Sequence, residues 1–461
     1  MRLRCIFAFV SLACGCGEKA AAPVREPAPS AAASAQPPPS AMPSSEGMAE
    51  HQSPAPASSA VVVGPASGAS VGHLLGAGRL THVFEALAAL EDGHAHDDVR
   101  VLQYGDSHTA SDIGVSAFRR ALQARFGDGG RGFVAVGRPW KTYSEDGVHT
   151  GMEGAFVSTR PPGGKSSPEP VALEGRNGLL GIGITAGKQR GRAWAEVAAP
   201  ASHVELAYAE QPGGGSFDVF VDGTRTGHVS TQSADTKSGW SAFDVPDAPH
   251  RVEVRAAGDG DVVLYGMNLD RSQAGVMVDT LGINGAQIFT PLRWNEDHFA
   301  EQMKHAAPDL VVLAYGTNEA VQPGLTDANY ERAVVDMLGR VARATPTASC
   351  LLLGPPDLGW HTKGKEDWYT LPRLGEIIAM QKRVADAAGC AFFDQREAMG
   401  GPGSILQWAT EPEPRANSDR VHLRRSGYTQ VGTTFATDLM RAYDEWRAER
   451  GLPPTNGVAV R

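Results

Sequence analysis

The sequence is poor in cysteine and in clusters of basic residues, and each shortage excludes a class of protein. Five cysteines among 461 residues are too few for the disulfide framework of a small secreted domain. Lys and Arg total 42 against 52 Asp and Glu, which gives a formal net charge of −10. Nucleic-acid surfaces need clustered Lys and Arg, which this chain lacks. We therefore expect no nucleic-acid partner and a neutral or weakly charged ligand.

Long apolar runs are also scarce. The N-terminus, MRLRCIFAFVSLACGCGEK, has two arginines followed by an apolar stretch from Cys5 to Ala13, which is too short to span a bilayer. This pattern predicts an export signal over residues 1–16. The letters SLAC resemble a bacterial lipoprotein cleavage site with Cys14 as the lipidated residue, or Cys16 in its place, and an ordinary secretory signal is the alternative. In both cases we expect an exported protein, and with lipidation one anchored in the cell envelope, facing the periplasm or the cell surface.

Residues 17–75 are dominated by Ala, Pro and Ser and contain few large apolar side chains, so they predict a disordered tether. Cys350 and Cys390 lie beyond it, each beside an apolar run. Two cysteines define no recognisable framework, and we expect buried free thiols rather than a disulfide.

Apolar strands alternate with amphipathic helices in two parts of the chain. VRVLQY, VMVDTLG, DLVVLAYG, SCLLLGPP and CAFFD predict strands, and helices are expected near 80–93, 326–344, 371–388 and 427–449. This alternation predicts a flavodoxin-like three-layer α/β fold with a parallel sheet, in two parts over 76–139 and 275–450. Residues 140–274 instead contain short alternating runs broken by Gly, Pro and Asp, which predict an inserted all-β sandwich, jelly-roll-like, and 451–461 form a tail.

Four short segments place reactive side chains at the ends of predicted strands. They are GDSH (105–108), GINGAQ (282–287), YGTNEA (315–320) and SDRVHL (418–423). Functional groups of open parallel sheets gather beyond the carboxyl ends of the strands. Each segment alone is a weak signal, and their combination in this order predicts one active site.

These four segments resemble the motif blocks of the SGNH, or GDSL-type, hydrolase superfamily. The resemblance implies Ser107 as nucleophile, with Asp419 and His422 completing a catalytic triad. It also implies an oxyanion hole made by the Ser107 amide, Gly285 and Asn318. A serine hydroxyl needs a base to take its proton, a histidine is the usual base near neutral pH, and an aspartate three residues away can orient its ring.

Other residues in or near these segments are candidates for supporting roles. His108 is an alternative base, but consecutive side chains project in different directions, so we favour His422. The family's commoner leucine is replaced by His108, and the aspartate of its usual GxND block is replaced by Glu319. We expect Asp106, His108, Asp112, Glu319 and Trp360 to surround the reacting groups or to line the substrate cleft. His94, His96, Asp97 and Asp98 have no second ligand cluster, so no metal is expected, and the resemblance implies no cofactor.

The residues GDSHTASD, ALQARFGDGGRGFV and GRPW, the β-rich insertion and the export signal resemble the bacterial peptidoglycan O-acetylesterases of this superfamily, in which a carbohydrate-binding-like β domain interrupts the hydrolase. The resemblance implies removal of acetyl groups from an extracytoplasmic glycan, through an acetyl-serine intermediate. An O-acetyltransferase with the same triad is one alternative, and a non-catalytic glycan-binding lipoprotein is another. The expected partners are an acetylated glycan and, through the lipid anchor, a membrane.

Overall fold

The computed structural model describes residues 70–159, 175–362 and 367–452. The predicted export signal, Cys14, Cys16, most of the predicted tether and most of the tail lie outside these ranges. The last residues of the predicted tether belong to the fold, because β1 (Leu74–Leu75) pairs antiparallel with β17 (Ala391–Phe393). No helix in the described ranges is long and apolar enough to cross a membrane.

The first of the two large sheets, sheet A, is the predicted parallel sheet. In the described part of the chain it has six strands in the order β1-β17-β14-β13-β2-β12. Its further strands are β2 (Val99–Gly105), β12 (Val276–Gly282), β13 (Leu310–Ala314) and β14 (Ser349–Leu353). All neighbours are parallel except β1 and β17. Counted along the chain, the parallel strands have the order 2-1-3-4-5 of flavodoxin-like sheets, in which ligands bind where the order reverses, between β2 and β13.

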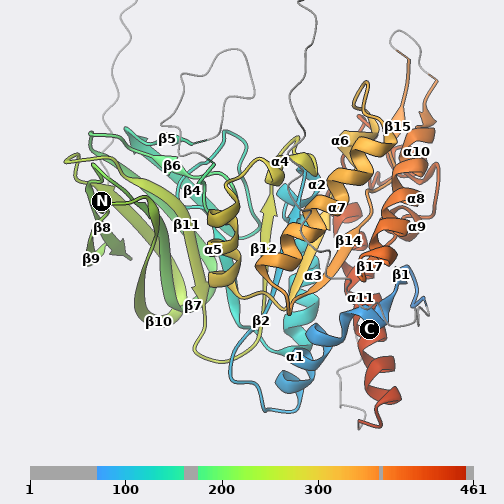
Figure 1. The fold of residues 1–461 in the computed structure, drawn as a ribbon, viewed down its shortest axis with the longest axis horizontal. Coiled ribbons are helices and arrows are strands. Elements are labelled where there is room, and N and C mark those ends of the chain that lie inside the picture. Colours follow the sequence, from blue (N-terminus) through green and yellow to red (C-terminus); the bar gives the residue numbers. More distant parts are fainter. Residues whose placement is uncertain (1–69, 160–174, 363–366, 453–461) are drawn as a thin grey trace, which may run out of the picture. The chain divides into compact units, whose positions relative to one another are not determined.

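Helices cover both faces of sheet A, as predicted (Figure 1). On one face, α1 (Thr81–Glu91), α3 (Ile113–Phe126) and α11 (Arg425–Glu449) pack against residues such as Val101 and Val312. On the other face, α5 (Glu296–Ala306), α7 (Asp327–Ala344) and α8 (Pro372–Ala387) pack against residues such as Leu102 and Leu313. Successive residues of each strand therefore enter opposite cores, as the period of two in a strand requires.

Short elements connect these layers. They are η1 (Ala77–Leu80), α2 (Ser107–Ala110), α4 (Phe289–Leu292), α6 (Thr317–Ala320), α9 (Gln395–Ala398), α10 (Ser404–Thr410), β15 (Gly359–Trp360) and β16 (Tyr369–Thr370). Of these, α2 and α6 directly follow β2 and β13, at the carboxyl edge of sheet A. These two turns therefore lie where the strand order reverses.

The predicted all-β insertion is present as an antiparallel sheet, sheet B. The described residues give it nine strands: β3 (Gly130–Val134), β4 (Val148–Gly154), β5 (Val157–Ser158), β6 (Ile184–Thr185), β7 (Gly191–Glu210), β8 (Ser216–Val221), β9 (Thr224–Ser230), β10 (Lys237–Ala256) and β11 (Val263–Asp270). β7 and β10 are 20 residues long each, and they join the strands into one continuous sheet around a separate apolar core. β3 pairs with β11, so sheet B begins before residue 140.

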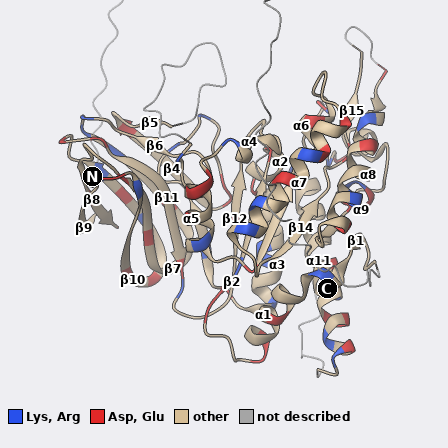
Figure 2. Ribbon diagram, viewed as in Figure 1, with Lys and Arg blue, Asp and Glu red and all other residues tan. Residues whose placement is uncertain are grey.

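Basic and acidic residues are interspersed along the helices and along the strands of sheet B (Figure 2). Many of them form ion pairs within the fold. Arg100 of β2, for example, donates to Asp279 of β12 at 2.9 Å and to Asn268 of β11 at 2.5 Å, so polar contacts join the two sheets.

The expectation of free thiols at Cys350 and Cys390 is wrong, because these residues form a disulfide. Cys350 lies on β14 and Cys390 immediately precedes β17, and the register pairs Leu351 with Ala391. The two cysteines therefore face each other at the start of neighbouring parallel strands, with Cα atoms 4.9 Å apart. Forty residues and a helix separate them in the sequence, so only the strand register brings them together.

We expect the Cys350→Ala/Cys390→Ala variant to lose about 4 kcal/mol of unfolding free energy, because the cross-link restricts the unfolded chain over a loop of this length. Denaturant unfolding of the oxidised protein and of the variant measures this difference. Reduction of the natural protein should lower its stability by a similar amount, and a reductant should leave the variant unchanged. Equal midpoints for the natural protein and the variant would contradict the expectation.

Candidate active site

The serine of the GDSH segment lies on a tight turn after β2. Asp106 caps α2 and accepts a hydrogen bond from the His108 N–H at 2.9 Å, and Ser107 is the first residue of this helix. Gly105 is required here for space, since a Cβ would lie 2.1 Å from the Thr109 Oγ1. The absence of that side chain lets the turn close against the end of β13.

The helical segment that follows the serine is divided into two helices, α2 and α3. α2 is a single turn, and the chain breaks at Asp112, which has φ 56° before α3 begins. A one-turn helix has only a small dipole, so the Ser107 amide acts as an individual donor rather than as the end of a long helix. The structure gives this N–H no partner among the described residues.

Ser107, His422 and Asp419 form a continuous chain of hydrogen bonds. The Ser107 Oγ lies 2.9 Å from the His422 Nε2, and the His422 Nδ1 lies 2.9 Å from the Asp419 Oδ2. The His422 and Asp419 side chains are 41% and 48% exposed, so the base is open to an incoming substrate. This is the contact pattern expected of a nucleophile, its base and the group that orients the base.

The loop between α10 and α11 holds Asp419 and His422 in this arrangement. The Asn417 N–H donates to the His422 carbonyl oxygen at 2.8 Å, which closes a tight turn around Asp419. One carboxylate oxygen of Asp419 accepts the backbone N–H groups of Val421 and His422, and the other faces the imidazole. Partial burial raises the pKa of Asp419, but these hydrogen bonds outweigh it and lower the pKa overall. The carboxylate therefore stays ionised while it orients His422.

The His108 ring is hydrogen-bonded to Tyr428 and not to the Ser107 hydroxyl. Its Nδ1 lies 3.0 Å from the Tyr428 hydroxyl, and its ring is buried beside the ring of His422, with centroids 5.4 Å apart. Burial, together with the nearby charge of His422, lowers the pKa of His108 to about 3. His108 is thus neutral at ordinary pH and poorly placed to take the serine proton, which agrees with the preference for His422.

The predicted oxyanion donors converge on the same edge of sheet A. Gly285 has φ 74°, its Cβ position is open space, and its N–H has no partner among the described residues. Asn318 lies in α6, and its amide Nδ2 donates to the Ala286 carbonyl oxygen at 2.9 Å and lies 3.5 Å from the Asp106 carboxylate. The Asn318 side chain therefore lies against the Gly285 segment and also faces Asp106, beside Ser107.

Glu319 connects the two segments that carry these donors, a role that sequence reasoning missed. It is buried, and its two carboxylate oxygens accept the N–H groups of Ile288 at 2.7 Å and Gly316 at 3.0 Å. Burial raises the pKa of Glu319 to about 7, although the backbone N–H groups oppose this shift. The replacement of the family's aspartate was the sequence signal, but the reach of the longer side chain to Ile288 is visible only in the fold.

The other residues that we expected near the site have different surroundings. Asp106 is buried behind the serine turn, and burial raises its pKa to about 6. Asp112 is fully buried in an ion cluster with Arg119 and Arg131. Trp360 is 41% exposed on β15, and its neighbour Gly359 donates its N–H to the carbonyl oxygen of Arg420, next to Asp419.

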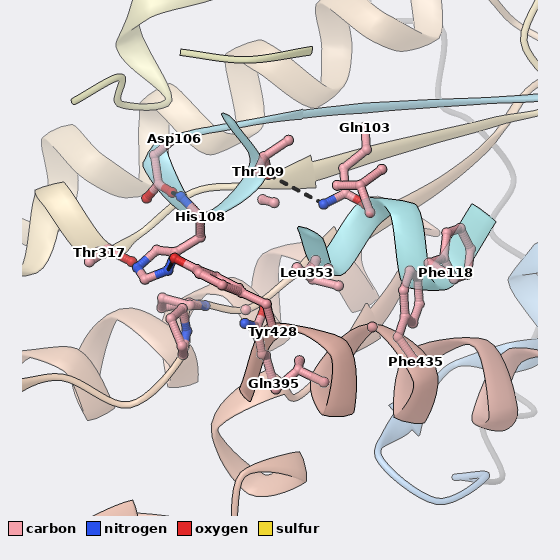
Figure 3. Close-up of a pocket in the computed structure, with 18 of the residues that line it drawn as sticks. Gln103, Asp106, His108, Thr109, Phe118, Thr317, Leu353, Gln395, Tyr428 and Phe435 are labelled. Atoms are coloured by element: carbon pink, nitrogen blue, oxygen red, sulfur yellow. Dashed lines mark hydrogen bonds between the residues drawn. The ribbon is translucent and has the colours of Figure 1, made fainter. Parts of the chain in front are cut away.

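A cavity of about 40 Å³ lies behind the serine turn (Figure 3). Polar side chains surround one end of it, among them Asp106, His108 and Tyr428, and Phe118 and Phe435 close the other end. Ser107 and His422 are not among its lining residues. The cavity is therefore an internal space beneath the reacting groups rather than the substrate entrance.

In the acidic and histidine-rich turn at residues 94–98, Asp98 accepts a hydrogen bond from the backbone N–H of Gly275 at 2.8 Å. In the part of the chain that the structure describes, no group of three or more His, Cys, Asp or Glu side chains is arranged to hold a metal ion.

Replacing Asn318 by alanine should lower kcat for ester hydrolysis by about 10²- to 10³-fold with a small change in KM, since one oxyanion donor contributes mainly in the transition state. Steady-state kinetics on a small acetyl ester measure this. Asn318→Asp should lose at least as much, because a carboxylate repels the developing oxyanion. A kcat within threefold of the natural enzyme for Asn318→Ala would exclude the amide as a donor.

Comparison with known proteins agrees with this geometry. A family model described as the GDSL-like Lipase/Acylhydrolase family matches residues 248–430, a range that includes Gly285, Asn318, Asp419 and His422. A solved peptidoglycan O-acetylesterase is 26% identical to this chain, covers 79% of this chain and 96% of its own, and superposes with a TM-score of 0.64.

Two further solved structures are more distant. A putative GDSL-like lipase from Parabacteroides merdae is 19% identical over 37% of this chain and 73% of its own, with a TM-score of 0.28. A family two carbohydrate esterase from Clostridium thermocellum is 11% identical over 66% of this chain and 99% of its own, with a TM-score of 0.24. Neither carries an argument about function. No curated protein matches the chain. The part of the chain that carries Gly285, Asn318, Asp419 and His422 therefore matches the GDSL-like lipase/acylhydrolase (SGNH) family, and the chain shares its fold with a solved esterase.

Proposed function

We propose that this protein is a serine esterase that removes O-acetyl groups from an extracytoplasmic glycan, with acetylated peptidoglycan as its substrate. The single observation that carries the reaction type is the hydrogen-bonded chain from Ser107 through His422 to Asp419, beside Gly285 and Asn318. The similarity to a solved peptidoglycan O-acetylesterase supports the choice of glycan, because it extends over 79% of this chain and thus over parts of both sheets.

The proposed reaction proceeds in two acyl-transfer steps. The Ser107 Oγ attacks the acetyl carbonyl carbon while the His422 Nε2 takes the hydroxyl proton, and Asp419 stabilises the imidazolium that forms. The Ser107 and Gly285 N–H groups and the Asn318 amide donate to the oxyanion. The C–O bond to the sugar then breaks, and His422 gives its proton to the leaving sugar hydroxyl. Water, deprotonated by His422, then attacks the acetyl carbonyl carbon. The bond from that carbon to the Ser107 Oγ breaks, His422 returns the proton to the serine oxygen, and acetate leaves.

The proposal also includes export from the cytoplasm and a lipid anchor at Cys14, or at Cys16. The basic and apolar N-terminal residues support export. The Cys350–Cys390 disulfide supports it independently, because such bonds form and persist mainly in oxidising compartments. Incorporation of a radiolabelled fatty acid into the expressed protein, lost in the Cys14→Ala variant or only in the Cys16→Ala variant, tests the anchor.

The test of the activity is acetate release by the full-length protein from O-acetylated peptidoglycan and, in parallel, from acetylated xylan. We expect release from peptidoglycan that depends on Ser107, and little release from xylan. Equal acetate release from both glycans would show an esterase that does not prefer peptidoglycan. Acetyl transfer to an added glycan acceptor that outpaces hydrolysis would favour a transferase, and glycan binding without any turnover would favour a binding protein.

A further inference from the structure

A surface groove of about 420 Å³ lies next to the oxyanion segments, between α4 and the start of α7. Gln287 and Gln322 hydrogen-bond to each other at this groove. Gln287 directly follows Ala286, whose carbonyl oxygen accepts the Asn318 amide at 2.9 Å. The groove thus begins at the segments that hold the oxyanion donors.

The groove carries two arginines whose charges are not balanced by the protein. Arg293 and Arg332 both line it, both are exposed, and neither forms an ion pair with any described residue. Asp336 is the one acidic residue among the lining side chains.

This lack of pairing contrasts with the neighbouring arginines. Arg340 and Arg343 on the same helix, α7, both pair with Glu296, and Arg373 nearby pairs with Asp327 and Glu376. In a chain of net charge −10, acidic partners are abundant. Two unpaired guanidinium groups in one groove therefore favour an anionic ligand.

The floor of the groove is partly apolar. Phe289 and Leu292 of α4 line it and are half-buried against the core of sheet A. A ligand that fits this surface has apolar groups as well as negative charge. A peptide arm that ends in carboxylates has both properties, whereas a neutral polysaccharide chain has no charge to pair with the two arginines.

We propose that this groove binds a carboxylate-bearing peptide arm of the acetylated glycan, with Arg293 and Arg332 pairing with its carboxylates while the ester lies at Ser107. This inference rests on the proposed function and extends it, because it identifies the part of the chain that distinguishes peptidoglycan from a neutral acetylated glycan. It also modifies the expectation of a neutral or weakly charged ligand, which came from the net charge of the whole chain. The local charge at the groove has the opposite sign.

The test compares the natural enzyme with the Arg293→Ala/Arg332→Ala variant on soluble O-acetylated peptidoglycan fragments that retain their peptide arms. We expect KM to rise about 3- to 10-fold with kcat nearly unchanged, since each exposed charge pair contributes modestly to binding. KM for p-nitrophenyl acetate should stay the same. The difference between the enzymes should shrink at about 0.5 M salt, which screens exposed charges.

Two controls separate local binding from general electrostatics. Lys304→Ala removes an exposed cation from α5, outside the groove, and should leave KM for the fragments unchanged. Fragments whose carboxylates have been converted to neutral amides should bind the natural enzyme as weakly as untreated fragments bind the double variant. An unchanged KM for the double variant, or an equal rise for Lys304→Ala, would overturn the proposal.

The result that would refute the proposed function differs from the result that would refute the groove. An enzyme that hydrolyses p-nitrophenyl acetate but releases no acetate from the fragments would refute the peptidoglycan esterase assignment itself. Calorimetric titration of the same fragments into Ser107→Ala protein, with and without the two arginine substitutions, then tests binding at the groove separately. A 3- to 10-fold weaker affinity without the arginines would support the groove as the binding site. Affinity that is absent in both proteins, or equal in both, would overturn this proposal.

Discussion

Replacing Ser107 by alanine should reduce acetyl-ester hydrolysis by a factor of about 10³ or more, with the fold intact. The alanine lacks the oxygen that lies 2.9 Å from the His422 Nε2, so no acetyl-serine can form. Any residual rate would come from the oxyanion donors and from binding alone. Acetate release and p-nitrophenyl acetate hydrolysis measure the loss, and circular dichroism with a thermal melt verifies the fold.

Ser111→Ala is the matched control for this variant. Ser111 follows α2, four residues after Ser107, and its hydroxyl donates to the His108 carbonyl oxygen at 2.8 Å rather than to His422. Its removal should change the rate by less than about threefold, as expected for a group that does not take part in the reaction. If Ser107→Ala retains more than a tenth of the activity, or if Ser111→Ala loses as much as Ser107→Ala, Ser107 is not the nucleophile.

The Asp112→Asn variant should lose about 3 kcal/mol of unfolding free energy, because it leaves the buried Arg119 without its counter-ion and leaves Arg131 with Glu145 alone. Asp112 is fully buried and accepts hydrogen bonds from Arg119 at 3.0 Å and Arg131 at 3.1 Å. The Asp146 N–H and the Thr280 hydroxyl also donate to it, at 2.8 Å and 2.5 Å. Asparagine tolerates the left-handed backbone at this position, where φ is 56°, so the substitution tests the charge rather than the backbone.

Denaturant unfolding of the two proteins at pH 7 measures this loss. Asp444→Asn is the control, because it removes an ion pair with Arg125 in which the carboxylate is 55% exposed, and it should cost less than about 1 kcal/mol. A loss for Asp112→Asn no larger than for Asp444→Asn would show that the buried cluster does not stabilise the fold.

The contribution of Asp112 should also depend on pH. Burial raises the pKa of Asp112, but Arg119 and Arg131 outweigh this effect and lower it below the usual value. A carboxyl with a depressed pKa stabilises the folded state above its unfolded-state pKa of about 4, and this stabilisation is lost as the pH falls further, through the folded-state pKa. The stability difference between the natural protein and Asp112→Asn should therefore narrow below about pH 4. A difference that grows on acidification would contradict this assignment.

The sequence alone was sufficient to predict features that depend on a local residue pattern, such as the positions of the buried strands. The apolar runs at 99–105, 276–282 and 310–314 form the predicted strands, since strands buried on both faces need continuous apolar residues. Reactive residues that directly follow such strands must meet at one edge of a parallel sheet. The order of strands and motifs along the chain was therefore enough to group the segments with Ser107, Gly285 and Asn318 into one site.

The tertiary structure decided the features that depend on register and on side-chain reach. The Cys350–Cys390 bond follows from the pairing of β14 with β17, and the loop that carries Asp419 places the His422 ring within hydrogen-bond distance of Ser107. Glu319 bridges two turns, and Asp112 pairs with an arginine from sheet B. Each of these contacts joins segments that lie far apart in the chain or depends on how far a side chain reaches across a turn. Periodicity and motif spacing describe mainly near neighbours, so they could not show that these particular residues come into contact.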